Sequence, residues 1–315
     1  MIVSNQEFFK HLETRFTWAP FLKLTYLCDN ECEHCCERAG PNCEPKFIEL
    51  VDIKNILEQF KYIKNFSKYV TLTGGEPMMA YVAKNEHYIP TILKYCGKNG
   101  YDVSINTNAH WTSWDCAGKI YSDFDEFVKK YNNRLTFHLS LDKWHRNPVE
   151  SNAKFLNWIV KNNTISADRT NLYMFFDGPE IVIQLIMKLK TDFDLELLPE
   201  PVLQTKFFSL HKFSGTDKTL CIMPYFGIDN LGRARDNGLA TKELFSKTDI
   251  YFSNRSDPDK EICFDANGIA TLCACDDDTI KTPYYEKNGK MKNLAVIKRE
   301  LFDMAYKAYS QENQF

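Results

Sequence analysis

Short apolar runs alternate with amphipathic runs between residues 20 and 205. The short runs have a β-like pattern, and this predicts six strands, at Phe21–Leu27, Tyr69–Thr73, Asp102–Thr107, Leu135–Leu141, Leu172–Phe176 and Asp194–Leu198. The runs between them place apolar residues three and four apart, as Ile53, Ile56, Leu57 and Phe60 show. That spacing predicts a helix between successive strands.

Further helices are predicted over Tyr88–Lys98 and Cys116–Tyr131, and after Pro148 and Pro179. Strands that alternate with helices favour a parallel sheet. Right-handed crossovers should wind about six such units into an open barrel. We therefore expect an α/β fold, a partial (β/α)6 TIM-like barrel.

The alternation ends after residue 205, and residues 206–290 are richer in Gly, Asp and Cys. Asn267-Gly268 between two apolar runs predicts a β-hairpin. A last helix is predicted over Leu294–Tyr309, because its apolar residues fall on one face. We expect four parts, an N-terminal extension, the barrel, a small α+β extension and a C-terminal helix, at residues 1–19, 20–205, 206–290 and 291–315.

The composition is that of an ordinary soluble globular protein, with 44% hydrophobic and 26% charged residues among 315. A net charge of −3 argues against a broad basic surface for nucleic acid. No apolar run approaches the ~20 residues that a membrane span needs, and the N-terminus has no apolar secretory segment. We expect a cytoplasmic protein that binds neither membranes nor nucleic acid.

Cysteine changes this ordinary picture, because five of the eleven cysteines fall between residues 28 and 43. In reducing cytosol, clustered cysteines more often bind metal or do chemistry than form disulfides. Cys28, Cys32 and Cys35 have the spacing C-x3-C-x2-C and follow the first predicted strand, at the end where barrel enzymes build active sites. Three thiolates on one loop can bind three irons of a cubane cluster and leave the fourth iron open.

The stretch from Cys28 to Cys35, Cys-Asp-Asn-Glu-Cys-Glu-His-Cys, resembles the signature of radical S-adenosylmethionine (radical SAM) enzymes. His34 takes the position that is usually an aromatic ring. The resemblance implies a [4Fe–4S] cluster whose open iron chelates SAM, and reductive cleavage of SAM to a 5′-deoxyadenosyl radical. By itself, such a cysteine group is also compatible with a zinc site or a chance cluster.

A second motif, Gly74-Gly75-Glu76-Pro77, follows the second predicted strand and favours the radical SAM interpretation. It resembles the family's GGEP segment, which contacts the methionyl amino group of SAM. Glycines let a backbone approach a ligand closely, and Glu76 can accept hydrogen bonds from an ammonium group or orient the neighbouring backbone. Alone, the motif would be a simple turn.

Polar residues also end the third and fourth predicted strands. Asn108, Ser140 and Asp142 lie where relatives place groups around SAM, and the resemblance implies a cofactor-binding role for them. His110, His138 and His145 lie near the same strand ends. Each could act as a general base, although a structural histidine is the commoner case.

The C-terminal extension carries a second group of cysteines, Cys221, Cys263, Cys273 and Cys275. Residues 268–273 have the G-x4-C form of SPASM and twitch domains, which implies an auxiliary [4Fe–4S] cluster on these four cysteines. The short Cys263–Gly268 spacing and the missing later cysteine run depart from a full SPASM domain. The alternative is that Cys263 is a buried strand residue.

Three basic residues are also candidate ligands. Gly232-Arg233-Ala234 resembles a short segment that is common before that appendage. Lys143, Arg233 and Arg235 could bind a substrate carboxylate or phosphate, although a lone arginine is more often a surface residue.

The resemblance implies an oxidoreductase-type enzyme that takes its electron from a reductant such as flavodoxin or ferredoxin and abstracts a hydrogen atom from its substrate. We expect peptide modification, as in many SPASM and twitch relatives, by C–S or C–C bond formation or dehydrogenation. About 19 residues precede the core, so a peptide would need direct docking or a separate recognition protein. The alternatives are a dehydrogenase or rearrangement enzyme for a small sugar, nucleoside or amino acid, and a non-catalytic iron–sulfur or zinc protein.

Overall fold

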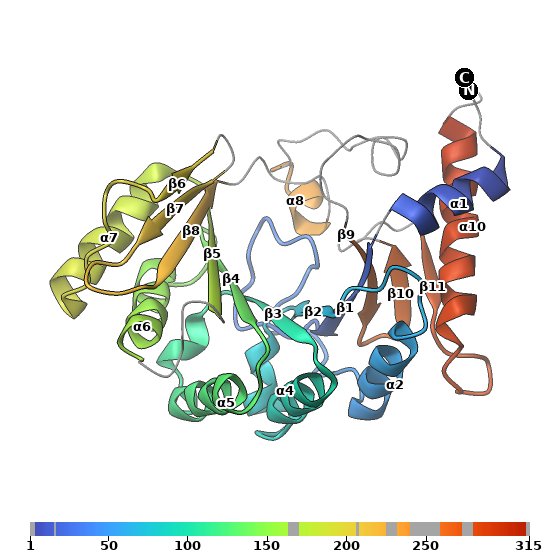
Figure 1. The fold of residues 1–315 in the computed structure, drawn as a ribbon, viewed down its shortest axis with the longest axis horizontal. Helices are drawn as coiled ribbons and strands as arrows, with labels where there is room; N and C mark the ends of the chain where they lie inside the picture. The colour runs from blue at the N-terminus through green and yellow to red at the C-terminus, as the bar shows by residue number, and fades with distance from the viewer. Residues whose placement is uncertain are drawn as a thin grey trace.

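The computed structural model describes residues 4–15, 17–162, 170–205, 208–224, 232–239, 259–272 and 280–312. These residues contain one sheet of eleven strands, in the order β11-β10-β9-β1-β2-β3-β4-β5-β8-β7-β6. Figure 1 shows that the sheet is curved and that helices line its outer side. Because different strands lie at the two ends of the order, the described sheet is not closed.

The central strands run parallel, as the alternation of strands and helices predicted. The strands from β1 to β8 are β1 (Thr17–Thr25), β2 (Tyr69–Gly74), β3 (Asp102–Thr107), β4 (Leu135–Leu141), β5 (Thr170–Phe176), β6 (Leu203–Gln204), β7 (Ser209–Lys212) and β8 (Thr219–Pro224). The elements between them are α2 (Leu50–Phe60), η1 (Pro77–Met79), α3 (Ala80–Ala83), α4 (Tyr88–Asn99), η2 (His110–Ser113), α5 (Ala117–Lys130), α6 (Pro148–Lys161) and α7 (Pro179–Phe193).

Alternating side chains give the sheet one apolar and one polar face. Leu22, Leu72, Ile105 and Phe137 form a continuous row across four strands, and each is fully buried in the main hydrophobic core with the covering helices. Neighbouring strand positions point to the opposite face and carry polar groups such as Ser104. The concave side of the sheet is therefore lined by side chains that can meet polar ligands.

The predicted strand Asp194–Leu198 does not form. Asp194 adopts a left-handed φ of 53° and caps α7, and within this stretch Leu197 alone makes a bridge, to Phe213. The parallel strand beside β5 is instead β8, which follows the antiparallel pair β6 and β7. Here tertiary pairing outweighs a local strand pattern.

The C-terminal strands extend the sheet on its other side. β9 (Asp259–Asp265) pairs in parallel with β1, and β10 (Ile269–Leu272) and β11 (Lys281–Pro283) continue it antiparallel. The predicted hairpin at Asn267-Gly268 is confirmed, and Gly268 has the positive φ, +85°, that such turns need. The division of the chain at residues 19, 205 and 290 stays a prediction.

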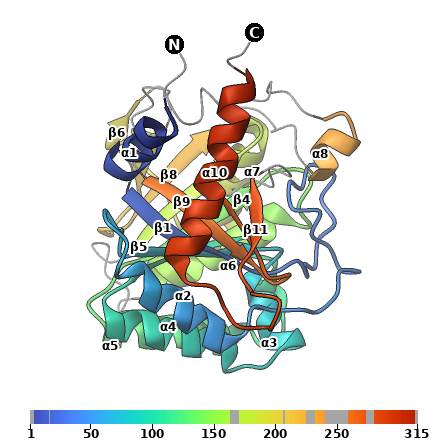
Figure 2. The same ribbon diagram turned by 90° about the vertical axis from the view of Figure 1, so that its right-hand side faces the viewer.

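Helix α10 (Leu294–Glu312) confirms the predicted C-terminal helix and packs against α1 (Asn5–Arg15). The ring centroids of Phe8 and Tyr306 lie 5.5 Å apart, and those of Phe9 and Phe302 lie 5.6 Å apart. Figure 2 shows α10 running across the molecule with α1 beside it. Within the described ranges, no helix combines the length and the apolar character that crossing a membrane requires.

Candidate functional site

The loop after β1 carries the three cysteines predicted to bind a cluster. Cys28 and Cys32 are buried and Cys35 is half-buried. The amide of Asn30 donates to Sγ of Cys28 at 3.4 Å. Burial raises the pKa of the Cys28 and Cys35 thiols, and the nearby Glu76 raises that of Cys28 further. Thiolates in such surroundings need a strong positive partner, and bound iron supplies one.

Gly74 and Gly75 bring the end of β2 against the start of the cysteine loop. A Cβ on Gly75 would lie 2.2 Å from the carbonyl oxygen of Leu27, and a Cβ on Gly74 2.2 Å from that of Thr25. Their absence lets the amide of Gly75 donate to Thr25 (2.7 Å) and that of Glu76 to Leu27 (3.0 Å). The glycines thus serve a contact between two backbones, and the ligand approach expected from sequence stays a prediction.

The side chain of Glu76 is fully buried and joins the β2 loop to the end of β3. Its carboxylate accepts hydrogen bonds from the amide of Met78 (3.1 Å), the hydroxyl of Thr107 (2.8 Å) and the amide of Asn108 (2.9 Å). Burial and the nearby Asp29 raise the pKa of Glu76 to about 8, against the opposing effect of these bonds. In this arrangement Glu76 orients the neighbouring backbone, and Pro77 opens η1 directly after it.

Asn108 connects the motifs of three loops. Its side-chain nitrogen donates to Oδ1 of Asp29 at 2.9 Å and lies 3.8 Å from Sγ of Cys28. Its side-chain oxygen accepts from the amide of His110 at 2.8 Å, and Nδ1 of His110 contacts Oδ2 of Asp29. Cys28, Glu76, Asn108 and His110 therefore belong to one hydrogen-bonded network at the carboxyl ends of β1, β2 and β3.

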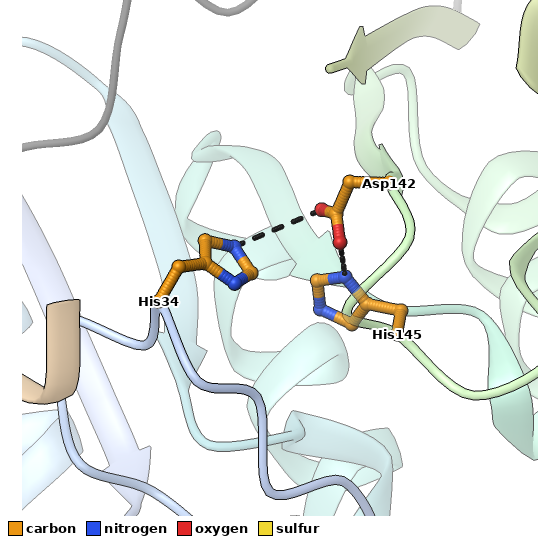
Figure 3. A group of neighbouring side chains, drawn as sticks. All are labelled: His34, Asp142 and His145. Carbon is orange, nitrogen blue, oxygen red and sulfur yellow. Dashed lines mark hydrogen bonds and ion pairs between the residues drawn. The ribbon is translucent and has the colours of Figure 1, made fainter. Parts of the chain in front are cut away.

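Asp142, at the end of β4, is fully buried between two histidines (Figure 3). Nδ1 of His145 lies 2.8 Å from Oδ1 of Asp142, and Nε2 of His34 lies 3.8 Å from Oδ2. The amide of Trp144 also donates to Oδ1, at 3.1 Å. The loop after β4 thereby contacts the cysteine loop, since His34 lies between Cys32 and Cys35.

His34, Asp142 and His145 also have the spacing of a single-ion site, with ligand atoms within 4.8 Å of one another. In the part of the chain that the structure describes, no other group of three His, Cys, Asp or Glu meets that spacing. The sulfur atoms of the three cysteines do not lie within this spacing, and a cubane cluster does not require them to. Thiolates that bind three different irons lie further apart than the ligands of one ion.

Two of the three candidate histidines, His138 and His145, differ in charge at neutral pH. Burial alone would lower the pKa of His145, but hydrogen bonds to Asp142 and Cys32 raise it to about 10. His138 lies on β4 between the rings of Tyr173 and Phe175, and burial lowers its pKa to about 4. A histidine that stays protonated at neutral pH has no free lone pair, so His145 suits ion pairing better than proton abstraction.

Ser140 lies two residues beyond His138 on the same strand, half-buried and opposite Phe175 of β5. Its carbonyl accepts a hydrogen bond from the side chain of Asn152 at 3.0 Å, which fixes the start of α6 against the end of β4. The predicted cofactor residues Gly74–Pro77, Asn108, Ser140 and Asp142 thus share one edge of the sheet with the cysteine loop.

The second cysteine group is described only in part. Cys221 lies on β8 and Cys263 on β9, and five strands, β1 to β5, separate these two in the sheet. Cys273 and Cys275 lie outside the described residues. The four-cysteine ligand set therefore stays a prediction.

A cavity of about 480 Å³ lies beside the cysteine loop on the β9 side. Cys43 and Cys263 both line it, together with the buried Lys23 and with Asp265. Lys23 forms an ion pair with Glu37 at 2.8 Å. No local motif singles out Cys43, and only the fold shows that it shares a cavity with Cys263.

Arg233 occupies a different place from the one suggested by its sequence. It lies in α8 (Gly232–Asp236), and its Nε donates to the carbonyl of Cys32 at 2.8 Å while its amide donates to that of Cys35 at 2.9 Å. The guanidinium also donates to the carbonyl of Ala39. These contacts satisfy backbone groups of the cysteine loop rather than a substrate carboxylate or phosphate.

Three comparisons relate this chain to known proteins. The Radical SAM superfamily model matches residues 22–169. Putative protein YfkA of Bacillus subtilis (strain 168) is 33% identical over 84 residues, which are 27% of this chain and about a fifth (21%) of that protein. The crystal structure of Streptococcus suis SuiB bound to precursor peptide SuiA aligns at 13% identity and a TM-score of 0.39, covering 96% of this chain and 67% of that one. The matched segment begins on β1 and includes the cysteine loop, the GGEP segment, Asn108 and Asp142. Residues 22–169 of this chain therefore form a Radical SAM superfamily domain.

Proposed function

We propose that the chain binds a [4Fe–4S] cluster through Cys28, Cys32 and Cys35, and SAM beside it at the carboxyl ends of β1 to β4. Superfamily membership implies an enzyme with both cofactors. When bound, they supply a radical that abstracts a hydrogen atom from the substrate. The protein's part is to hold, orient and shield these groups.

The donor set around the cysteine loop fits an anionic cluster. Two of the three cysteines are buried, and Sγ of Cys28 lies within reach of two N–H donors, from Asn30 and Asn108. Hydrogen bonds to sulfur are a common way for proteins to stabilise thiolate-bound iron. Lys23 is paired with Glu37 nearby, so the loop also lies beside a buried ion pair.

One observation carries the proposal, namely the contact of Asn108 with both Cys28 and Asp29 while its amide binds Glu76. It brings the cysteine loop, the GGEP segment and the end of β3 together at one sheet edge. We assign Gly74–Pro77, Asn108, Ser140 and Asp142 to the SAM site, because they share this edge with the cysteines.

We further propose a peptide substrate and an oxidative outcome. The described sheet is open between β6 and β11, so its concave face is not enclosed by strands, which suits a substrate larger than a metabolite. The resemblance of residues 268–273 to twitch and SPASM segments supports the same substrate class. An auxiliary cluster near Cys263 would have room in the adjoining cavity of about 480 Å³.

Anaerobic reconstitution tests the central proposal. Purified chain is loaded with iron and sulfide, both are counted, and 5′-deoxyadenosine is measured after addition of SAM and dithionite. Ala variants of Cys28, Cys32 and Cys35 should each lose the product. Cys96→Ala, in a buried position of α4, should retain it. Zinc in place of iron, or full activity in a variant lacking Cys32, would contradict the proposal.

Iron counting also tests the second cluster. About eight irons per chain support an auxiliary cluster, and about four argue against it. For the substrate, peptides encoded beside this gene are compared with sugars, nucleosides and amino acids carrying deuterium. Deuterium transferred into 5′-deoxyadenosine from a peptide supports peptide modification, and transfer only from a small molecule argues against it. A reductant such as flavodoxin or ferredoxin should replace dithionite in the same assay.

A further inference from the structure

Arg233 reaches the cysteine loop from a segment about 200 residues later in the chain. Three carbonyls of that loop are its partners. Nε donates to Cys32 at 2.8 Å, the backbone amide donates to Cys35 at 2.9 Å, and a terminal guanidinium nitrogen donates to Ala39. The side chain is about one-fifth (19%) exposed, so these bonds are largely shielded from water.

Two further contacts hold α8 against the same loop. The side chain of Asn237 donates to the carbonyl of Glu33 at 2.9 Å. The guanidinium of Arg38 binds both carboxylate oxygens of Asp236, at 3.0 and 3.2 Å. Contacts from α8 and from Asn237, which follows it, thus reach the loop at Cys32, Glu33, Cys35, Arg38 and Ala39. They span the segment that holds two of the three cysteines.

The loop needs such partners because it has little regular structure of its own. Between residues 28 and 39 it contains only turns and irregular backbone, whose carbonyls lack helix or sheet partners. The planar guanidinium binds two carbonyls at once in a fixed geometry, which an ammonium group cannot reproduce. Arg233 thus donates to the carbonyls of both Cys32 and Cys35 from outside the matched domain.

We propose that Arg233 is a positioning residue of the iron–sulfur site. From α8 it holds residues 32–39 in the shape that binds the cluster, and it places a permanent positive charge beside the cluster. A fixed cation next to a thiolate-bound cluster favours the reduced, more negative form. This inference rests on the proposed function, because it assumes a cluster on Cys28, Cys32 and Cys35.

Lysine and alanine variants separate the two effects. Arg233→Ala removes both the planar donor group and the charge, whereas Arg233→Lys keeps the charge and loses the paired donors. Arg235→Ala, on the same helix and with an exposed side chain, is the matched control. Each reconstituted protein is measured for iron per chain, for the rate at which a chelator removes iron, and for the midpoint potential by electron paramagnetic resonance.

We expect Arg233→Ala to lose iron at least fivefold faster than Arg235→Ala and to have a more negative midpoint potential. Arg233→Lys should lose iron faster than wild type and keep a midpoint potential close to that of wild type.

Equal iron loss and equal potentials in all four proteins would overturn the inference while leaving the proposed function intact. If wild type itself binds no cluster, the proposed function fails and this inference falls with it. Circular dichroism of the apo proteins separates local loosening from a failure to fold. Should Arg233→Ala not fold, iron loss from Arg233→Lys decides, and a rate equal to wild type overturns the inference.

Discussion

The carboxylate of Glu76 lies 2.8 Å from the hydroxyl of Thr107 and joins the loop after β2 to the end of β3. The same carboxylate oxygen accepts a hydrogen bond from the backbone amide of Asn108, and the side chain of Asn108 contacts Cys28 and Asp29. A single buried acid therefore connects the GGEP segment to the cysteine loop through the end of β3. Its protonation should affect the stability of the whole site.

The pKa of Glu76 is raised to about 8 in the folded chain, from an ordinary value of 4.5. The folded state therefore holds this proton more tightly than the unfolded state. The resulting stability is fully present below pH 4.5 and is lost as pH rises through 8. Each pKa unit is worth about 1.4 kcal/mol, so the loss is on the order of a few kcal/mol. Glu76→Gln should flatten the pH dependence of urea unfolding between pH 5 and 9. Parallel curves for the two proteins would contradict this reading.

Replacing Gly75 or Gly118 by alanine should change the stability of the protein in opposite directions. In Gly75→Ala the new Cβ would lie 2.2 Å from the carbonyl of Leu27, so the backbone must move and the bonds to Thr25 and Leu27 weaken. We expect severe destabilisation and a several-fold drop in iron uptake. In Gly118→Ala of α5 the new Cβ would meet no atom within 4 Å beyond its own stretch of helix, and alanine should stabilise the helix by about 0.5–1 kcal/mol. Thermal unfolding of the two apo variants checks both signs.

The Asp142–His145 pair should be costly to break. Asp142 is fully buried and its Oδ1 lies 2.8 Å from Nδ1 of His145. Removing one charge of a buried pair leaves the other uncompensated, so Asp142→Asn should lower the free energy of unfolding by about 3 kcal/mol. Asp192→Asn, in an exposed pair with Lys188 on α7, should cause no measurable change. Equal unfolding midpoints for the two variants would show that the buried pair has no special role.

His138 should make the chain sensitive to acid. Burial lowers its pKa to about 4, whereas an unfolded chain takes up this proton near pH 6.5. The stability from neutral His138 is fully present above pH 6.5 and is lost as pH falls through 4. His138→Phe keeps ring contacts with Tyr173 and Phe175 and should reduce the loss of stability between pH 6.5 and 4. The exposed His87, changed to Gln, should leave the acid profile as in wild type; an unchanged profile in His138→Phe would exclude the assignment.

Local patterns predicted most of the central fold. Five strands and the helices after them formed close to where apolar spacing placed them. The predicted strand at Asp194–Leu198 was wrong. Asp194 ends α7 in a left-handed conformation, and long-range pairing places Thr219–Pro224 beside β5 instead. No local pattern in the sequence predicted the pairing of β9 with β1. Parallel partners so distant in sequence are determined by the tertiary fold.

The site divides in the same way. The cysteine spacing and Gly74–Pro77 are local motifs, so sequence could single them out. The contacts of Arg233 could not be predicted, because its partners are backbone carbonyls that any sequence possesses. The role of Gly75 could not be predicted either, because its missing side chain makes room for the backbone of Leu27, a partner that only the fold shows.

The position of β1 between β2 and β9 has a consequence for biosynthesis. β1 leads directly into the cysteine loop, yet one of its two neighbours is translated near the end of the chain. Until Asp265 has left the ribosome, that edge of β1 has no strand partner and exposes open hydrogen-bonding groups. A nascent or truncated chain that stops before β9 should therefore self-associate at the strand that precedes the metal-binding loop.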